Sequence, residues 1–576
     1  MFKSKLLIPT PSFLAHPLTA LAGGVLMGLT PAPVNAWFLA WIALVPLWLA
    51  IVVAADTQSG AIQPSRRDRF WGFVLRPLLW GLGYHGLALS WITDLHPLTW
   101  MGIPWLGSIA ITVFAWGFIT IWGALLVTIW ALGLSILCRL SWADVQQFLR
   151  ARLRFMPRVP RQPPKSFSFP SLSRAPSWLR ILMGTALWCA LETLWSSGAL
   201  YWTSLSYTQS PYNLPILHLG RLSGPMAVTA AIVAVNGCIA EAVWLRLYHR
   251  FNTTRSPNSI AARPYLLSAA SLLLSLHLVG GGLYRSSLAS PPENALRIGI
   301  VQGNIPTRIK LFDEGLRRSL SAYVTGYRSL VQQGVDVVLT PEGALPWLWV
   351  GSPRQTENPL YQAIVEQGVP AWVGTVGVEQ NRITQSLFTL AGTGEVLSRY
   401  DKVKLVPLGE YIPFEAIVGR LISRLSPVEA TMLPGRYDQR FETPFGRAIA
   451  GICYESAFAQ LFRNQAAAGG EFILTASNND PYGRAMMAQH HAQDTMRAIE
   501  TDRWAARATN TGLSGIVDPH GRTVWLSEFR TYVTHADTLY RRQSRTLYVR
   551  WGDWLTPLLA AMGLVAWSVS SPRTDR

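Results

Sequence analysis

Long apolar runs that contain almost no charged residues recur through the first half of the chain and return once near its end. An α-helix needs about twenty mostly apolar residues to cross the hydrocarbon core of a bilayer. The pattern therefore predicts seven membrane-spanning helices before residue 290 and one after residue 550. The expected spans cover residues 15–33, 36–54, 70–92, 104–138, 178–198, 224–245, 264–284 and 552–571.

Two of these apolar runs allow a second interpretation. The first follows Lys3 and Lys5 and ends near Val34-Asn35-Ala36, which resembles a cleavage site, so this run also fits a signal peptide. We favour a retained span. The run 104–138 is long for a single helix, and we count it as one long or tilted span. With two spans there, the basic loop that follows would change sides.

The loops between the expected spans differ in charge. The segment 139–177 and the other loops on its side are rich in arginine, whereas the alternate loops 31–35, 93–103 and 199–223 contain one basic residue, Arg221. Cytoplasmic loops of membrane proteins carry an excess of positive charge, so the basic side is expected to be cytoplasmic. After seven spans, the polar part of the chain emerges on the other side, which in a bacterium is the periplasm.

The polar part of the chain has a different pattern, in which short β-like runs alternate with stretches long enough for helices. The runs include Val335–Thr340 and Ala448–Cys453, and the helical stretches include Asp313–Gln333 and Gln489–Ala506. Such a mixture predicts a layered α/β domain around a buried sheet. The expected organisation is a transmembrane domain at 1–290 with a cytoplasmic basic loop at 139–177, a periplasmic α/β domain at 291–547, and a membrane helix with a short cytoplasmic tail at 548–576.

Composition supports an integral membrane protein and argues against one class of partner. Of the 576 residues, 50% are hydrophobic, 14% are charged and 25 are tryptophan, which is not the composition of a soluble enzyme. The formal net charge of +18 would suit a protein that binds nucleic acid. Much of that excess lies in the short loops that set membrane topology, so we expect no nucleic-acid partner.

One of the four cysteines lies in the polar part of the chain. Cys138, Cys189 and Cys238 lie in or at the ends of apolar segments, where packing is the expected role. Cys453 therefore has no obvious disulfide partner, and no Cys/His spacing resembles a zinc site. His490-His491 is an adjacent pair, and neighbours on a helix point in different directions, so no metal or other cofactor is expected.

Three predicted strands end in a reactive side chain. Cys453 ends the run Ala448–Cys453, Glu342 comes just past another buried strand, and Lys402 follows a third. A cysteine nucleophile needs a base for its proton, which a desolvated carboxylate provides, and a fixed lysine stabilises an oxyanion. Each residue also has a simpler interpretation: a buried structural cysteine, a helix-capping glutamate and a solvated surface lysine.

Several stretches around these residues resemble the nitrilase, or carbon–nitrogen hydrolase, superfamily. Together with the membrane spans, the whole chain is similar to a membrane-anchored branch of it, the apolipoprotein N-acyltransferase family. The run Val406-Pro407-Leu408-Gly409-Glu410-Tyr411-Ile412-Pro413, joined to multiple spans, is specific to that branch. The other matching stretches are Val301–Pro306, Thr340–Glu342, Tyr400–Lys402, Ile452–Glu455, Met496–Glu500 and Ala508–Ser514.

The resemblance implies a polytopic α-helical membrane domain of about eight spans and an α/β nitrilase-like domain, an αββα sandwich. It implies that Glu342 is the general base, Lys402 the oxyanion stabiliser and Cys453 the nucleophile. Lys404 is a rival for the lysine role, although the Tyr-x-Lys spacing favours Lys402.

The same resemblance implies supporting residues and shows departures from the family pattern. Glu410 corresponds to a supporting glutamate, and Tyr454 and Glu455 correspond to essential residues beside the nucleophile. Phe312 stands where the family often has a tryptophan ring. Asn479-Asp480-Pro481-Tyr482-Gly483 is a shortened form of a substrate-side stretch that usually contains tryptophan, so Asn479 is expected to support the site.

The expected function is a two-step acyl transfer in the bacterial cytoplasmic (inner) membrane. Cys453 takes an acyl chain from a membrane phospholipid, for which the family implies phosphatidylethanolamine, and holds it as a thioester. The amine of the diacylglyceryl-cysteine of an apolipoprotein then accepts the chain, which is the last step of lipoprotein maturation. Two alternatives remain open: a membrane-tethered amidase or nitrilase that passes the acyl group to water, and a transporter or assembly factor with an inactive domain.

Overall fold

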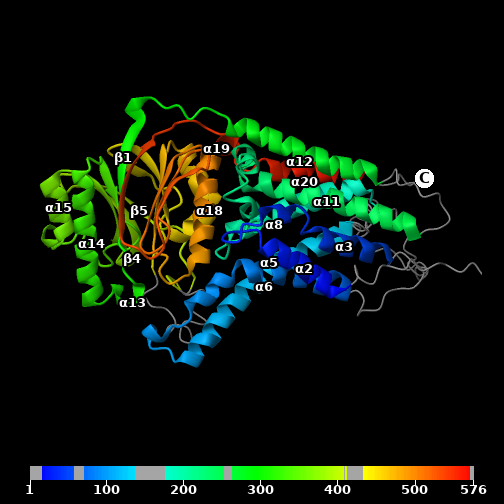
Figure 1. Ribbon diagram of the computed structural model, residues 1–576, viewed down its shortest axis with the longest axis horizontal. Helices are drawn as coiled ribbons and strands as arrows, with labels where there is room; N and C mark the ends of the chain where they lie inside the picture. The colour runs from blue at the N-terminus through cyan, green and yellow to red at the C-terminus, as the bar shows by residue number, and fades with distance from the viewer. Residues whose placement is uncertain are drawn as a thin grey trace, which may run out of the picture.

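The computed structural model describes residues 16–57, 70–137, 175–251, 262–407, 409–411 and 432–570. Along its long axis, the molecule has a bundle of helices at one end and an α/β domain at the other (Figure 1). Four features of the sequence lie wholly or almost wholly outside the described residues: Lys3 and Lys5, Cys138, the basic loop expected at 139–177, and the tail after residue 570.

Helices occupy each of the eight stretches that the apolar pattern predicts as spans. The run 104–138 forms one helix of 33 residues, as expected. Within the described ranges, four helical segments are long and apolar enough to cross a membrane, and α2 and α20 are shorter apolar helices. The four are Trp37–Ala55, Trp105–Leu137, Pro225–Leu247 and Arg263–Tyr284. The helices are α2 (Pro17–Gly28), η1 (Trp37–Trp41) with α3 (Val45–Thr57), η2 (Trp71–Leu75) with α5 (Arg76–Ala88), α6 (Trp105–Leu137), α8 (Ser177–Ser197), α11 (Pro225–Phe251), α12 (Arg263–Tyr284) and α20 (Leu555–Ser570).

A buried glutamate in α8 fixes the segment of the bundle that faces the α/β domain. Glu192 accepts hydrogen bonds from Trp188 Nε1 and from Thr229 Oγ1, both at 3.0 Å. It also accepts one from the hydroxyl of Ser204. A buried carboxylate needs such partners, because a buried charge without a partner destabilises the fold by several kcal/mol, roughly 3–5. Glu192 thereby holds the segment 199–204, which touches the α/β domain.

Two six-stranded mixed sheets form the core of the α/β domain. The first has the order β12-β1-β2-β3-β4-β5 and the second the order β11-β10-β9-β8-β7-β6. Strands β1, β2 and β3 pair in parallel, as do β7, β8 and β9, and the other neighbours are antiparallel. The strands are β1 (Ala295–Gln302), β2 (Val337–Leu339), β3 (Ala371–Glu379), β4 (Arg382–Leu390), β5 (Val396–Asp401), β6 (Phe441–Thr443), β7 (Gly446–Ile452), β8 (Phe472–Ser477), β9 (Ala505–Thr509), β10 (Gly515–Val517), β11 (Thr523–Leu526) and β12 (Val533–Tyr540).

The sheets pack face to face, and helices cover their outer faces. Trp372 in β3 meets Phe472 in β8 with ring centroids 5.7 Å apart. Helix α14 covers the first sheet together with α15, and α17 and α18 cover the second, with α18 between that sheet and the bundle (Figure 1). This arrangement confirms the αββα sandwich. The helices are α14 (Asp313–Gln332), α15 (Pro359–Gln367), α17 (Ala459–Ala467) and α18 (Arg484–Thr501).

One predicted helix has the wrong limits. The expected helix Gln489–Ala506 begins earlier, at Arg484, and ends at Thr501, and Ala505–Thr509 forms β9 instead. The helix ends because Asp502 adopts the left-handed conformation, with φ of +57°, which closes α-helices and breaks their hydrogen-bond pattern. The edge strands β11 and β12 were not predicted, because β11 is only four residues long and mostly exposed, and β12 is mostly half-buried with polar and apolar residues mixed.

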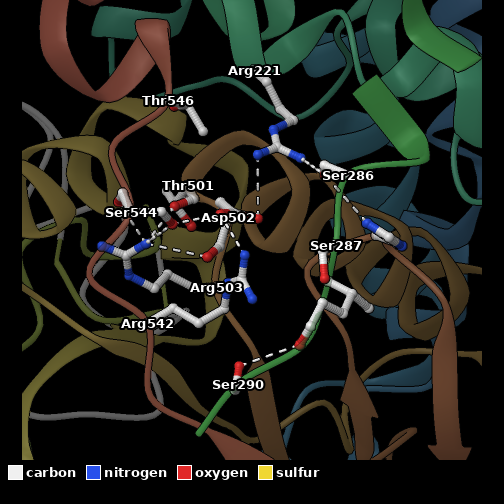
Figure 2. A network of polar contacts seen from close by, with 12 residues as sticks. Arg221, Ser286, Ser287, Ser290, Thr501, Asp502, Arg503, Arg542, Ser544 and Thr546 are labelled. Carbon is white, nitrogen blue, oxygen red and sulfur yellow. Dashed lines mark hydrogen bonds and ion pairs between the residues drawn. The ribbon is translucent and has the colours of Figure 1, made fainter. Parts of the chain in front are cut away.

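A polar network joins the bundle to the α/β domain at a point that we call the distal junction, made of Arg221, Ser286, Asp502, Arg542 and Ser544 (Figure 2). Arg221 lies 3.4 Å from one oxygen of Asp502 and donates to Ser286 Oγ at 2.8 Å. The other Asp502 oxygen accepts from Arg542 at 3.0 Å and from the Ser544 hydroxyl. Arg221 is the one basic residue in the loops 31–35, 93–103 and 199–223, and its ion pair with Asp502 gives a structural reason for its presence there.

Candidate active site

Cys453 lies at the point where β7 ends and a tight turn begins. The strand stops at Ile452, and the short helix η10 (Cys453–Ala457) follows. Cys453 has a φ of +51° and is only 6% exposed. A residue other than glycine pays conformational energy in this left-handed region, and such strain is concentrated at functional sites. The turn thus presents the thiol at the end of the sheet rather than along it.

Glu342 and Lys402 reach the thiol from the first sheet, so the three residues bridge both sheets. Glu342 follows β2 and Lys402 follows β5. Lys402 Nζ lies 2.8 Å from Glu342 Oε1 and 2.6 Å from Glu410 Oε1, and its side chain is 1% exposed. The second oxygen of Glu342 accepts the backbone N–H of Asn478 at 2.8 Å. One buried ammonium is therefore shared by two carboxylates.

The surroundings of Cys453 favour a neutral thiol in the resting site. Burial raises the pKa of Cys453, the Glu342 carboxylate raises it further, and Lys402 opposes both. Burial alone would lower the pKa of Lys402, but Glu342 and Glu410 hold that pKa well above its usual range, so the lysine stays charged. A neutral thiol beside a carboxylate suits activation by a general base, with a fixed cation nearby for an oxyanion.

The two supporting glutamates act in different ways. Glu410 contacts Lys402 directly and accepts the Val406 N–H at 2.8 Å with its other oxygen. Burial raises the pKa of Glu410, and Lys402 partly offsets that effect. Glu455 instead accepts the N–H of Val403 at 2.6 Å and that of Ile452 at 2.7 Å. Glu455 therefore ties the loop after Lys402 to the turn of Cys453.

The side chain of Tyr454 contacts the bundle. Its hydroxyl donates to the Ala199 carbonyl at 2.7 Å and accepts the Tyr201 N–H at 2.9 Å. Its ring stacks on that of Trp202, with centroids 6.1 Å apart and planes 6° apart. We call Tyr201, Trp202 and Tyr454 the proximal junction, because Tyr454 directly follows Cys453 in the chain.

Asn479 acts on Cys453 through a histidine whose role the sequence did not reveal. Asn479 Nδ2 lies 3.1 Å from His490 Nδ1, and His490 Nε2 donates to the Cys453 carbonyl at 2.8 Å. Burial lowers the pKa of His490 to about 3, so the ring stays neutral with its proton on Nε2. The neighbouring His491 turns to Thr523 Oγ1 at 2.8 Å. The described residues hold no cluster of three potential metal ligands.

The remaining candidates are Lys404 and Phe312. Lys404 Nζ donates to the Ser197 carbonyl at 3.1 Å and lies 4.6 Å from the centre of the Phe458 ring. Phe312 is 63% exposed and is the N-cap residue of α14. The sequence signal that points to His490 is weak: its pairing with Asn479 depends on packing between a loop and α18.

Comparisons with known proteins agree with both parts of the structure. Residues 23–238 match the family model described as "Apolipoprotein N-acyltransferase N-terminal domain", and residues 297–537 match "Carbon-nitrogen hydrolase". The chain is 52% identical over 544 residues to an apolipoprotein N-acyltransferase of Nostoc sp., covering 94% of this chain and 97% of that one. It is 45% identical to the apolipoprotein N-acyltransferase of Synechocystis sp., covering 94% and 98%. A solved amidase from Nesterenkonia sp. is 19% identical, with a TM-score of 0.34, over 45% of this chain and 95% of that one.

Proposed function

Because the chain belongs to the apolipoprotein N-acyltransferase family, we propose that Cys453 carries the acyl chain during the transfer that this family catalyses. The protein is an acyltransferase whose substrates are an acyl donor and an apolipoprotein. The observation that supports the role of Cys453 is its strained, buried position beside a glutamate and a lysine that form an ion pair at 2.8 Å. That set supplies a nucleophile, a base and a cation.

The first step forms a thioester and releases a lysophospholipid. Glu342 takes the thiol proton, and the Cys453 sulfur attacks the carbonyl carbon of a phospholipid ester. Lys402 stabilises the negative charge on the carbonyl oxygen of the tetrahedral intermediate. When the intermediate collapses, the ester C–O bond breaks, and the leaving alkoxide takes the proton from Glu342.

The second step passes the acyl chain to the lipoprotein. The neutral α-amine of the diacylglyceryl-cysteine attacks the thioester carbonyl, again with Lys402 beside the oxyanion. Glu342 takes the proton from the attacking nitrogen, the C–S bond breaks, and the thiolate of Cys453 is reprotonated from Glu342. The products are a triacylated lipoprotein and the free enzyme, ready for the next phospholipid.

The membrane context belongs to the same proposal. The domains extend over 1–290, 291–547 and 548–576, and all eight predicted spans cross the bacterial inner membrane, with the α/β domain on the periplasmic side. The alternation of basic and non-basic loops supports this topology. A domain held by spans at both ends keeps its active site close to the bilayer, where a phospholipid such as phosphatidylethanolamine is the available donor.

A transfer assay separates this function from hydrolysis by the same three residues. Purified protein is incubated with phospholipid labelled in its acyl chains and a diacylated lipopeptide. We expect labelled triacylated peptide from the wild type and from Cys238→Ala, a control that removes another buried thiol, and none from Cys453→Ala. Release of labelled free fatty acid without triacylated peptide would contradict transfer and favour the amidase interpretation.

A further inference from the structure

A second buried amine lies beside Glu342. Lys310 is the last residue of the short helix α13 (Thr307–Lys310) and is 3% exposed, whereas the next residue, Leu311, is 58% exposed. Lys310 Nζ donates to the backbone carbonyl of Glu342 at 3.4 Å, and a Cβ atom placed on Gly343 would lie 3.6 Å from that nitrogen. The amine therefore rests against the backbone of the proposed base.

Close packing holds Lys310 in this place. Gly315, in the first turn of α14, has no room for a side chain, because a Cβ atom there would lie 2.6 Å from Lys310 Cα and 2.0 Å from the carbonyl oxygen of Ile309. Gly343 has a φ of +55°, which a residue with a side chain rarely adopts. Gly315 therefore lets α14 pack directly on the backbone of α13, and Gly343 allows the turn that follows Glu342.

The same region links α13 to the loop that holds the Glu342 carboxylate. The backbone N–H of Thr307 donates to Asp480 Oδ2 at 2.5 Å, and the backbone N–H of Asn478 donates to Glu342 Oε2 at 2.8 Å. Helix α13, the loop 478–480 and Glu342 are thus connected, with Lys310 between them. A displacement of α13 would therefore also move the Glu342 carboxylate through these hydrogen bonds.

The charges around Lys310 indicate what it does. Burial lowers the pKa of Lys310 to about 8, while Glu342 and Asp480 act in the opposite direction. The amine is therefore mostly charged at neutral pH. A buried cation near a carboxylate favours the ionised form of that carboxylate. The charged and titratable groups that face Glu342 are Lys310, Lys402 at Oε1, Glu410 and Cys453, and Asp480 faces Lys310.

We propose that Lys310 is a positioning residue for Glu342, which holds the backbone of the proposed base and places a positive charge near its carboxylate. The proposal rests on the role of Glu342 given above. Lys402 alone does not make Lys310 redundant, because Lys402 is shared with Glu410 and also has to face the oxyanion.

The test follows acylation of Cys453 by intact mass in the full-length protein, with phospholipid vesicles, between about pH 5 and pH 9. We expect Lys310→Met and Lys310→Gln to slow acylation at pH 7 about tenfold or more and to move the acidic limb of the pH profile up by about one unit. Lys310→Arg should recover most of the rate, because it keeps the charge. Arg308→Met, an exposed cation of the same helix, should behave as the wild type.

The outcomes distinguish this inference from the function on which it rests. If the wild type forms no acyl adduct on Cys453, the proposed function fails. If the wild type is acylated and the Lys310→Met profile matches it in rate and shape, the inference alone is wrong. Equal losses in Lys310→Arg and Lys310→Met with an unmoved acidic limb would show a structural role and overturn it too. Lys310→Gln decides the matter if Lys310→Met does not fold, because glutamine retains a hydrogen-bond donor without the charge.

Discussion

The bundle and the α/β domain meet at two junctions that are built from different chemistry. The proximal junction uses aromatic stacking and backbone hydrogen bonds around Tyr454, which is covalently next to Cys453. The distal junction uses ion pairs around Asp502, whose side chain is 1% exposed. Packed aromatic rings fix the orientation of the groups they contact. Breaking a buried ion pair mainly lowers the free energy of unfolding, because it leaves a buried charge without a partner. The proximal junction should therefore control activity, and the distal junction stability.

Among substitutions at the two junctions, Tyr454→Ala should give the largest effect. Without the ring and its hydroxyl, the turn of Cys453 loses its support from Trp202 and Ala199. We expect the rate of Cys453 acylation to fall about 100-fold, because a displacement of about 1 Å at a reacting atom has that consequence. Tyr454→Phe, which keeps the stack, should lose less, and Tyr437→Ala, at an exposed tyrosine, should lose little. Wild-type acylation by Tyr454→Ala would remove the proposed link from junction to nucleophile.

Asp502→Asn should destabilise the protein and leave the chemistry intact. Asparagine tolerates the left-handed conformation of this position, but it leaves Arg221 and Arg542 without their charge partner. We expect the free energy of unfolding to fall by about 3 kcal/mol, as when one partner of a buried ion pair is removed. The acylation rate of the folded protein should stay within about twofold, and both quantities are measured in detergent.

A matched exposed pair controls for that substitution. Asp438 pairs with Arg436 at 2.7 Å on the surface, so Asp438→Asn should not change stability measurably. If Asp502→Asn abolished acylation without unfolding, the distal junction would act on the site and the division between the two junctions would be wrong.

Glu500 lies near the distal junction and makes the stability of the protein depend on pH. It pairs with Arg497 at 3.0 Å and lies under Gly220, next to Arg221. Burial raises the pKa of Glu500 to about 7, above its ordinary value of 4.5, so between these values the folded protein binds more protons here than the unfolded chain. Stability from this group is complete below about pH 4.5 and is lost as the pH rises to about 7.

The measurement compares the wild type with Glu500→Gln. The free energy of unfolding of the wild type, relative to that of Glu500→Gln, should decline by an amount on the order of 2 kcal/mol from about pH 4.5 to pH 7 and then level off. Parallel curves for the two proteins would show that Glu500 does not titrate in this range.

Lys404→Met should give the smallest effect. Its ammonium contacts the Ser197 carbonyl and the Phe458 ring at the edge of the proximal junction, and it does not contact Glu342. We expect a loss of acylation rate of less than about threefold, whereas Lys402→Met should lose almost all activity. If both variants lost activity equally, the lysine role would not belong to Lys402 alone.

Patterns along the chain predicted most of the architecture. Candidate membrane helices can be recognised directly in the sequence, because the hydrocarbon core of the bilayer requires apolar residues along the whole span. The runs before Glu342 and Cys453 likewise predicted buried strands whose ends carry these side chains, since a buried strand must be apolar on both faces. The four-layer arrangement itself came from resemblance to a family, not from periodicity.

The rest depended on contacts between distant segments. Tyr454 faces the bundle, and its partners Ala199 and Tyr201 lie about 250 positions earlier in the chain. The local pattern marks His490 only as a candidate metal ligand, because it does not show that α18 lies behind the Cys453 turn. Phe312, expected at the site from the family pattern, is exposed in the structure.

Intact mass spectrometry tests the central claim most directly. The purified wild-type protein is incubated with phospholipid vesicles, without acceptor, and then with a diacylated lipopeptide. We predict a mass gain of one acyl chain that maps to Cys453, is absent from Cys453→Ser, and disappears when the lipopeptide is added. An adduct of the same size in Cys453→Ser, or transfer to the lipopeptide by that variant, would contradict the account.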